Sequence, residues 1–371
     1  MSERKVIGLV VAPGVTEKLA ENLMEDIPDI LSEQHNNQIE WEIDLVVDPL
    51  TGYAERVEEI FKKVQAYHDE REWDYVLAIT DLPIFHHRRV MALDINMRNG
   101  AAIFSYPAFG WRPVKKRFKN AIVTIINEVH HAEQDHRNYD ENDYIEQSVK
   151  QQFPLSKIDK TQVYLDDTDS KHIRYLSSSR SRGMFRLVSG MTFANNPLNM
   201  MASLSNIVAI AFTTGAFGLI FTTMWQMANN FSMWRLFGIS IIAILGMLLW
   251  VMMSHDLWES TKQSSNKRIT LLYNLTTVMT LLIAVIIYYI ILYLMFLFAE
   301  LVLLPADFLG QQISLKGPAG LDLYLSIPWF AASISTVAGA IGAGLLDEEL
   351  IKESTYGYRQ RIRYEDTHKK Q

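Results

Sequence analysis

The stretch LLYNLTTVMTLLIAVIIYYIILYLMFLFAELVLL, residues 271–304, decides the fold, and Glu300 carries its only charged side chain. A helix needs about 20 apolar residues to cross a hydrocarbon core of roughly 30 Å. At about 1.5 Å per residue, this run reaches roughly 50 Å as a helix. We therefore expect a membrane-spanning helix whose last part, residues 291–304, extends past the outer leaflet, lies along it or dips back. Pro305 then ends the helix.

Three further runs have the length and apolar composition of a membrane span. They lie near residues 207–227, 234–253 and 321–346. Only the short segment ANNFSM joins the first two runs, which predicts an antiparallel hairpin. Together with the run that begins at Leu271, they predict an all-α transmembrane domain of four helices over residues 197–346.

Basic residues gather on one side of these four spans. They are Lys157, Lys160, Lys171, Arg174, Arg180, Arg182, Arg186, Lys262, Lys267, Arg268, Lys352, Arg359, Arg361, Arg363, Lys369 and Lys370. The opposite side has only Arg235 and Lys316. Because cytoplasmic flanks carry the excess of Lys and Arg, we expect a multi-pass protein of the plasma membrane with both termini in the cytoplasm, including a basic tail over residues 347–371. The expected partners are the lipid bilayer and the anionic headgroups of its inner leaflet.

Few side chains in the spans are polar enough to suggest a function. Asn274 lies near the cytoplasmic end of the third span. We expect Glu300 in the outer headgroup region or packed against the fourth helix, or alternatively in an ion or proton relay of a transporter or channel subunit. No Lys, Arg or His lies in the middle of any span to act as the relay partner. The small residues of STVAGAIGAGLL, residues 335–346, allow close helix packing, within one chain or between the copies of a homo-oligomer.

Residues 1–150 have a different pattern, which predicts a cytoplasmic α/β domain. Apolar runs at residues 5–11, 40–47 and 74–80 are typical of buried strands, and helical patterns separate them. This β-α-β-α-β order implies a largely parallel sheet. VMALDIN and AAIFSYPAF then flank MRNG, whose Asn-Gly pair predicts a β-hairpin. The amphipathic pattern of PVKKRFKNAIVTIINEVHHAEQDH predicts that a helix closes the domain.

Composition and motifs exclude several classes of function. The segment after the first strand, APGVTEK, has one glycine, whereas a dinucleotide-binding turn needs G-x-G-x-x-G, and there is no P-loop. No cofactor is therefore predicted. The chain has no cysteine, which excludes disulfides and thiolate metal sites. Its net charge is -7, without clustered basic and aromatic residues, so nucleic acid is not an expected partner.

The strand YVLAITDLPIF, the hairpin ending in GAAIFS and the helix ending in NEVHH resemble the layout of archaemetzincin-like zinc peptidases. That resemblance implies two histidines one turn apart on zinc, with a glutamate as base. Asn127 stands where the first histidine is needed, with Glu128 and His131 in place. Loss of one of three ligands normally abolishes such a site, so we predict no metal. A membrane-anchored hydrolase with a degenerate zincin-like domain is an alternative. The other interpretation is that His130, His131 and His136 lie at a solvated helix end.

The segment TDLPIFHHRR, residues 80–89, is a candidate ligand site. Asp81 follows a parallel strand, at the edge where open α/β sheets place ligand-binding groups. Together with Asp81, an anion or phosphate could be bound by the four residues His86, His87, Arg88 and Arg89. The alternative is an exposed basic loop that faces lipid headgroups or the acidic tract YDENDYIE.

The join between the two halves, residues 151–196, has two parts. Residues 140–180 are polar, and DDTDSK and SSSRSR predict a linker or irregular surface. RGMFRLVSGMTF, residues 182–193, mixes basic and large apolar side chains, which predicts an amphipathic juxtamembrane segment in the inner membrane interface.

Four motifs, GMTFANNPLNM, HDLWE, YNLTTVMTL and YGYRQR, occur between about residues 183 and 363. In these motifs the chain resembles a family of bacterial polytopic membrane proteins of uncharacterised function. Some members carry the label methylenetetrahydrofolate dehydrogenase, a soluble two-domain enzyme that needs the nucleotide-binding turn lacking here. The resemblance implies an architecture and no activity, and the sequence identifies no catalytic residue. We expect the cytoplasmic domain to act as a sensory, regulatory or scaffolding module coupled to four transmembrane helices.

Overall fold

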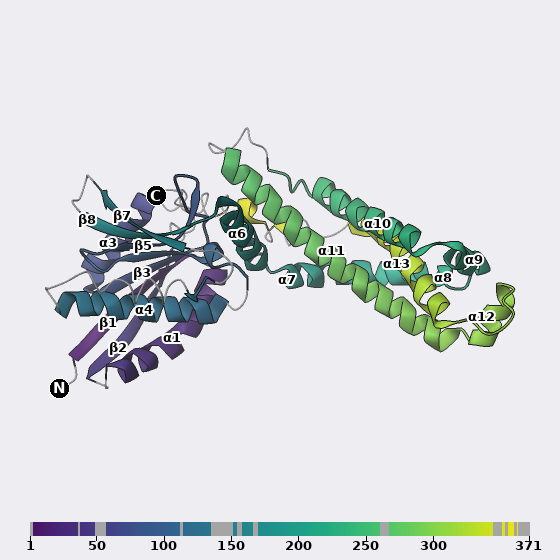
Figure 1. Cartoon of the computed structure of the whole chain (residues 1–371), viewed down its shortest axis with the longest axis horizontal. Coiled ribbons are helices and arrows are strands. Elements are labelled where there is room, and N and C mark those ends of the chain that lie inside the picture. Colours follow the sequence, from purple (N-terminus) through teal and green to yellow (C-terminus); the bar gives the residue numbers. More distant parts are fainter. Residues whose placement is uncertain are drawn as a thin grey trace. The chain divides into compact units, whose positions relative to one another are not determined.

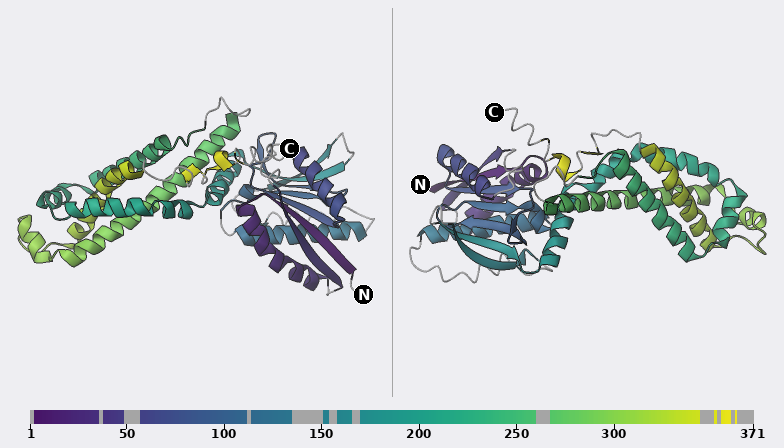
Figure 2. Two further views of the ribbon diagram at one scale, coloured as in Figure 1. Left: turned by 180° about the vertical axis from the view of Figure 1, so that it is seen from behind. Right: turned by 90° about the horizontal axis from the view of Figure 1, so that it is seen from above.

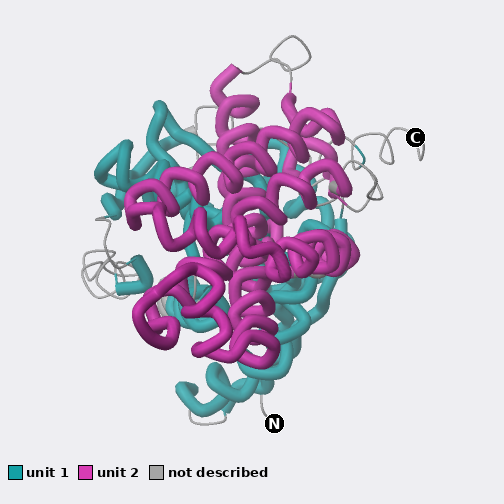
Figure 3. The backbone as a smooth tube through the Cα atoms, turned by 90° about the vertical axis from the view of Figure 1, so that its right-hand side faces the viewer, with its two compact units in different colours: residues 1–194, 360–371 teal, residues 195–359 magenta. Residues whose placement is uncertain are grey.

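A computed structural model describes residues 3–35, 38–48, 57–111, 114–134, 151–153, 158–165, 170–259, 267–343, 351–352, 355–359 and 362. The chain divides into two compact units (Figure 3). The α/β unit comprises residues 1–194 and 360–371, and the helical unit comprises residues 195–359. The prediction of an α/β region followed by a mostly helical region is confirmed. The acidic tract YDENDYIE and most of the basic tail lie outside the described residues.

The α/β unit contains one mixed sheet (Figure 1). Its strands are β1 (Glu3–Val11), β2 (Ile39–Val47), β3 (Tyr75–Thr80), β4 (Phe85–His86), β5 (Arg89–Asn96), β6 (Ala102–Ser105), β7 (Ile158–Leu165) and β8 (Ser170–Ser177). The order is β2-β1-β3-β6-β5-β8-β7, and β4 pairs with β5. The first four strands in this order pair in parallel, whereas β5, β8 and β7 are antiparallel to their neighbours. The predicted parallel order and the predicted hairpin, formed by β5 and β6, are both present.

Helices cover both faces of this sheet. α1 (Val15–Gln34) and α4 (Val114–Gln134) pack on one face, and α3 (Val57–Arg71) packs on the other (Figure 1). Tyr75 and Val76 show the alternation that this requires, because successive strand side chains point to opposite faces. The Tyr75 hydroxyl bonds His130 of α4, whereas Val76 lies in the cluster with Ile60 of α3. Gly8 of β1 lies beneath the Trp73 ring, where any Cβ atom would overlap the indole.

Two strands occur where the sequence predicts a linker. β7 and β8 pair along their whole length, and β8 also pairs with β5. The prediction of irregular surface for residues 140–180 is therefore wrong for residues 158–165 and 170–177. β7 is an edge strand of the sheet, and edge strands commonly carry charged and polar side chains. Its polar sequence, IDKTQVYL, contains no apolar run from which the strand could be predicted.

The predicted amphipathic segment is a helix, α6 (Arg180–Ala194), and most of its apolar side chains are covered by protein. Leu187 and Met191 are fully buried in the α/β unit. Gly190 lies against the backbone of Pro107 in the short helix η1 (Tyr106–Phe109), where a Cβ atom would overlap the Pro107 carbonyl. The interpretation that the apolar side chains lie in the membrane interface is therefore wrong for Leu187 and Met191, whereas Phe185 is 77% exposed.

In the part of the chain that the structure describes, the helical unit contains seven helices of seven residues or more. Figure 2 shows the ribbon from two further sides. The seven helices are α7 (Pro197–Ser203), α8 (Ser205–Gly218), α9 (Thr222–Asn230), α10 (Met233–Ser254), α11 (Lys267–Leu303), α12 (Ala306–Gln312) and α13 (Leu321–Ala343). Three of them, α10, α11 and α13, are long and apolar enough to cross a membrane. Three of the four predicted spans therefore correspond to single helices with the length and apolar composition of a span.

The first predicted span is broken. α8 and α9 pass the same test only as a pair, and they are bent by 91° at the residues between Gly218 and Thr222. The indole nitrogen of Trp225 donates a hydrogen bond to the carbonyl of Leu219 within this break, at 2.8 Å. The interpretation of residues 207–227 as one continuous helix is therefore corrected to a broken pair, and the number of candidate spans is three, or four if the pair counts as one.

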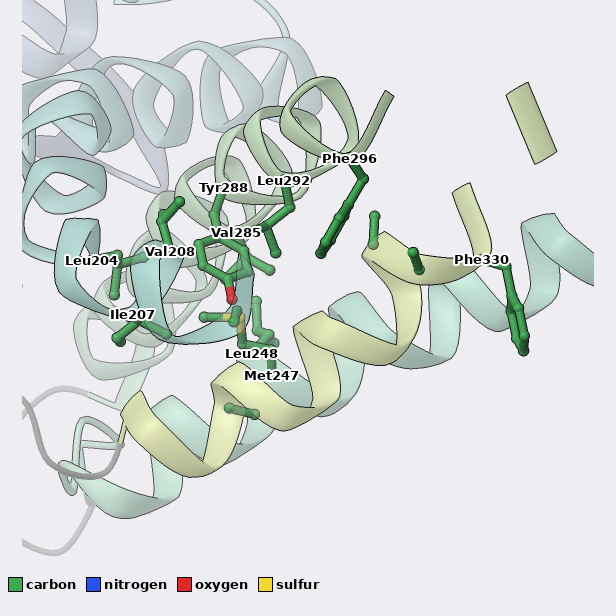
Figure 4. Packing of buried hydrophobic residues seen from close by; sticks show 14 of the residues in the cluster. Leu204, Ile207, Val208, Met247, Leu248, Val285, Tyr288, Leu292, Phe296 and Phe330 are labelled. Atoms are coloured by element: carbon green, nitrogen blue, oxygen red, sulfur yellow. The ribbon is translucent and has the colours of Figure 1, made fainter. Parts of the chain in front are cut away.

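The helix α11 has 37 residues and continues without interruption through the segment for which the sequence left three alternatives open. It ends at Leu303, and Pro305 precedes α12, as predicted. Tyr288, Leu292 and Phe296 form a buried stripe along α11 and extend towards α8 and α10 (Figure 4).

Candidate functional site

The most strongly connected charges in the α/β unit surround Asp94, whose carboxylate is fully buried. Asp94 of β5 and Arg174 of β8 are cross-strand partners, so their side chains lie on the same face. Arg174 Nε donates to Asp94 Oδ2 at 2.7 Å, and His172 Nδ1 lies 3.0 Å from Asp94 Oδ1. Because Asp94 is an acceptor, His172 carries its proton on Nδ1. Arg174 and His172 thus both donate to the Asp94 carboxylate, as burial of a charge requires.

His86 of β4 extends this network. Its Nδ1 lies 3.0 Å from the Arg174 NH1 atom, so His86 accepts through an unprotonated nitrogen. Burial, with the Arg174 charge as the second cause, lowers the pKa of His86 below its ordinary range. The His172 ring packs edge-on against Phe61 of α3, with ring centroids 5.0 Å apart. We call Asp94, Arg174, His172 and His86 the Asp94 cluster.

The structure places the five residues of the predicted ligand site in different environments. His86 belongs to the Asp94 cluster, and Asp81 is buried after β3. Arg89 is committed to β7 and β8: its Nε donates to the Ser177 carbonyl at 2.9 Å, and it forms an ion pair with Asp159. His87 and Arg88 form the β4–β5 turn, with φ values of 45° and 75°. Both values are left-handed, which is strained for residues other than glycine. An anion site made by all five residues stays a prediction.

The degenerate zincin motif lies on α4, and its first position has a structural partner. Asn127 Oδ1 lies 2.9 Å from His35 Nε2, and its amide also donates to Gln34. The side chains of Glu128 and His131 lie outside the described part of the chain. Within the described residues, no group of three or more His, Asp or Glu side chains is placed to hold a metal ion.

The neighbouring histidine, His130, is buried. Its Nδ1 lies 2.9 Å from the Tyr75 hydroxyl, and its ring packs edge-on against His35 and Trp41. The interpretation of His130 as part of a solvated helix end is therefore wrong. These contacts attach α4 to α1 and to the sheet, so His130 serves packing.

In the helical unit, Asn274 has both halves of its amide engaged. Its Oδ1 accepts from the backbone N–H of Glu259 at 2.9 Å, and its Nδ2 donates to the carbonyl of the same residue at 3.0 Å. Asn274 therefore holds the segment after α10 against α11.

Four segments far apart in the sequence meet near Asn274. Tyr273 stacks on Tyr356, with ring centroids 5.9 Å apart, and the Arg359 guanidinium lies 4.7 Å from the centre of the Tyr356 ring. Arg359 also donates to Asn195, whose amide donates to Thr280 at 3.0 Å. The four motifs GMTFANNPLNM, HDLWE, YNLTTVMTL and YGYRQR all contribute to this group of contacts. It was not foreseen, because nothing in a single sequence pairs distant polar residues.

Glu300 lies inside the helical unit and is 0% exposed. Neither carboxyl oxygen has a hydrogen-bond partner among the described residues. The reason for its burial is its position: Tyr288, Leu292, Phe296 and Glu300 recur every four residues, so they share one face of α11. Tyr293 of α11 and Tyr324 of α13 lie within electrostatic reach of it.

Sequence reasoning did not single out Asp94, His172 or Arg174 as site residues. His172 and Arg174 lie in the segment interpreted as a linker, and Arg174 was counted among the charges that flank the membrane. The alternation of His172, Arg174 and Leu176 in SKHIRYLS is the signal that a strand is present. A buried aspartate in a strand such as VMALDIN then implies a basic partner.

The three long apolar helices indicate that the protein belongs to the class of membrane proteins. Comparison of the chain with family models, with curated proteins and with solved structures finds no match.

Proposed function

We propose that the protein is a polytopic protein of the plasma membrane whose α/β unit is a cytoplasmic sensory or regulatory module. The observation that carries the membrane part is the outward face of the long helices. Large apolar side chains there are exposed, among them Trp234, Ile242, Leu249, Met253, Ile290, Leu294 and Phe298, and Trp234 is 82% exposed. An apolar surface of this extent needs lipid or another protein to cover it.

The proposed orientation has both termini in the cytoplasm, with the α8–α9 pair as a broken fourth crossing. Arg174 no longer supports this orientation as a flanking charge, because it is buried in the α/β unit, and Arg186 is half-buried there. The connection between α10 and α11 still carries Lys262, Lys267 and Arg268, and the opposite side still has only Arg235 and Lys316. The asymmetry of the remaining charges favours the same orientation.

A regulatory role for the α/β unit is supported by how its buried polar groups are used. The Asp94 carboxylate is neutralised by Arg174, Arg89 is committed to Asp159, and Asn127 is bonded to His35. Groups that are already paired stabilise a fold and are poorly placed to act on a substrate. We therefore propose that the unit binds or responds to a partner. The alternative is a membrane-anchored hydrolase, and a zinc measurement distinguishes the two.

The topology can be tested directly, because the chain has no native cysteine. Single cysteines are introduced at Asn229 and Lys316 for the outside, and at Ser265 and Gln371 for the inside. A membrane-impermeant maleimide added to intact cells should label the first two and spare the others until the cells are lysed. Labelling of Gln371→Cys in intact cells would overturn the orientation.

Native mass spectrometry of the full-length protein tests the assignment of the α/β unit. We expect a mass without zinc after purification in zinc-containing buffer. One zinc per chain that is lost in His131→Ala would instead favour the hydrolase alternative.

A further inference from the structure

Glu300 combines complete burial with the lack of a partner. Its side chain is 0% exposed, and neither oxygen finds a hydrogen-bond donor in the described part of the chain. An ionised carboxylate in such a place is strongly unfavourable, whereas a carboxylic acid that holds its proton is far less costly to bury. The position of Glu300 on α11 explains its burial, because Glu300 continues the buried stripe formed by Tyr288, Leu292 and Phe296.

Contacts between α8 and α11 show what lies at the level of Glu300. Phe296 packs on Phe212 with ring centroids 5.1 Å apart, and it also lies against Gly215. Ala211 precedes Gly215 in α8, and Tyr288 precedes Phe296 in α11. Both Ala211 and Tyr288 lie close to Gly339 of α13. The two helices therefore run in the same direction. One turn beyond Gly215 and Phe296, α8 reaches its break and α11 reaches Glu300.

The helix α13 is also irregular at this level. Ser335 lies beside Gly215, and the Tyr324 hydroxyl donates to the Leu304 carbonyl, so α13 runs antiparallel to α11. On α13, Pro328 lies between the two residues that make these contacts. On α11, Glu300 lies between Phe296 and Leu304, so Pro328 and Glu300 lie at about the same level. Proline has no N–H, so the helical hydrogen bond to the Tyr324 carbonyl cannot form.

A broken helix pair, a proline inside a helix and an unpartnered carboxyl thus lie at one level of the bundle. Interrupted helices beside a buried ionisable group are the usual way in which membrane proteins build ion and proton sites. We propose that Glu300 is a proton-binding site of the helical unit, at which the carboxyl holds one proton while buried and exchanges it with the solution. This inference rests on the proposed membrane location of that unit.

The surroundings favour a proton over a metal cation. A hard cation takes six or more oxygen ligands, often several of them carboxylates. The segments α8 and α9 contain no titratable residue at all. Tyr293 and Tyr324 each interact electrostatically with Glu300. Asp307 of α12 and Asp322 of α13 are exposed.

A hydrophobic carbodiimide tests this site, because the reagent partitions into apolar regions and reacts with carboxyl groups that carry a proton. The full-length protein is reconstituted into vesicles, treated with dicyclohexylcarbodiimide and digested for peptide mass spectrometry. We expect modification of Glu300 that declines as the pH is raised. The label should be lost in Glu300→Gln, retained in Glu300→Asp and unchanged in the matched control Asp307→Asn.

Three outcomes would overturn the proposal. Lack of modification at Glu300 in a chain that floats with the vesicles would refute the proton site and leave the membrane assignment intact. Protection of Glu300 by sodium, when compared with choline, would identify a metal-cation site instead. A chain that does not float with the vesicles would overturn the membrane location and this site together. The Glu300→Gln variant should retain the wild-type unfolding temperature, because an amide replaces a neutral acid with little change in shape.

Discussion

Asn274 of α11 binds the backbone of Glu259 in both directions, with its Oδ1 2.9 Å from the amide nitrogen and its Nδ2 3.0 Å from the carbonyl oxygen. A side-chain amide used in this way replaces the hydrogen bonds that a helix or strand would supply. The segment that follows α10 is thereby held in place although it has no regular structure of its own.

Replacement of Asn274 by leucine should destabilise the helical unit. It keeps the branched shape of the side chain but leaves the Glu259 N–H and carbonyl without the Asn274 partner, and each unsatisfied group costs about 1–3 kcal/mol. The free energy of unfolding is measured in detergent with a chemical denaturant. Asn230→Leu is the matched control, because Asn230 is exposed and bonds only its own helix. Equal stability of the two variants would contradict the role assigned to Asn274.

Loss of one partner from the Asp94–Arg174 pair should be among the most damaging single changes in the α/β unit. Arg174→Met leaves the fully buried Asp94 carboxylate with His172 alone, and removal of one member of a buried pair costs about 3–5 kcal/mol. The double variant Asp94→Leu, Arg174→Met should lose much less than the sum of the single changes. Arg4→Met is the control, because its pair with Glu42 is exposed and exposed ion pairs contribute little to stability. Additive losses in the double variant would refute the coupling.

The parts of the fold that sequence reasoning reached are those with a local signal. The strands β1 and β3 are continuous apolar runs, the β5–β6 hairpin has its Asn-Gly turn, and Pro305 precedes α12. Each of these signals acts within a few residues, through periodicity, turn geometry or a missing N–H. Local physics of this kind can be read without knowledge of the rest of the chain.

The parts that sequence reasoning missed depend on contacts between distant residues. β7 and β8 are polar because β7 is an edge strand and β8 carries the basic partners of Asp94. The break between α8 and α9 lies in the apolar stretch Gly218–Thr222, which contains no proline, and Trp225 supplies a hydrogen bond there. The burial of Glu300 could have been read from its four-residue spacing with Phe296, but its lack of a partner could not.

The Asp94 cluster should make the stability of the α/β unit depend on pH. Burial lowers the pKa of His86 in the folded state, so the unfolded chain binds more protons than the folded chain just below the ordinary histidine value of about 6.5. The contribution of neutral His86 is therefore present above that pH and is lost as the pH falls through the folded value. The groups that face His86 are Arg174, His87, Arg89 and Asp94.

Thermal unfolding of the full-length protein between neutral and mildly acidic pH measures this dependence. His86→Asn removes the titrating group, and its unfolding temperature should fall less on acidification than that of the wild type. His68→Asn, outside the cluster, is the control and should follow the wild type. A His86→Asn variant with the wild-type slope would show that other groups set the acid sensitivity.

Trp225 should stabilise the break between α8 and α9 through its indole N–H. The last carbonyls of a helix lack intrahelical donors, and the Trp225 nitrogen, 2.8 Å from the Leu219 oxygen, satisfies one of them. Trp225→Phe keeps a large aromatic ring but removes that donor, so the buried carbonyl is left unpaired at a cost of about 1–3 kcal/mol. The amides of Leu219, Ile220 and Phe221 should then exchange hydrogen faster, because their bonds to the end of α8 open more often. Trp234→Phe is the matched control, since Trp234 is exposed, and it should leave the exchange of these amides unchanged. Faster exchange throughout α8 in Trp225→Phe, without a local increase at the break, would show that Trp225 acts through general packing and not through this hydrogen bond.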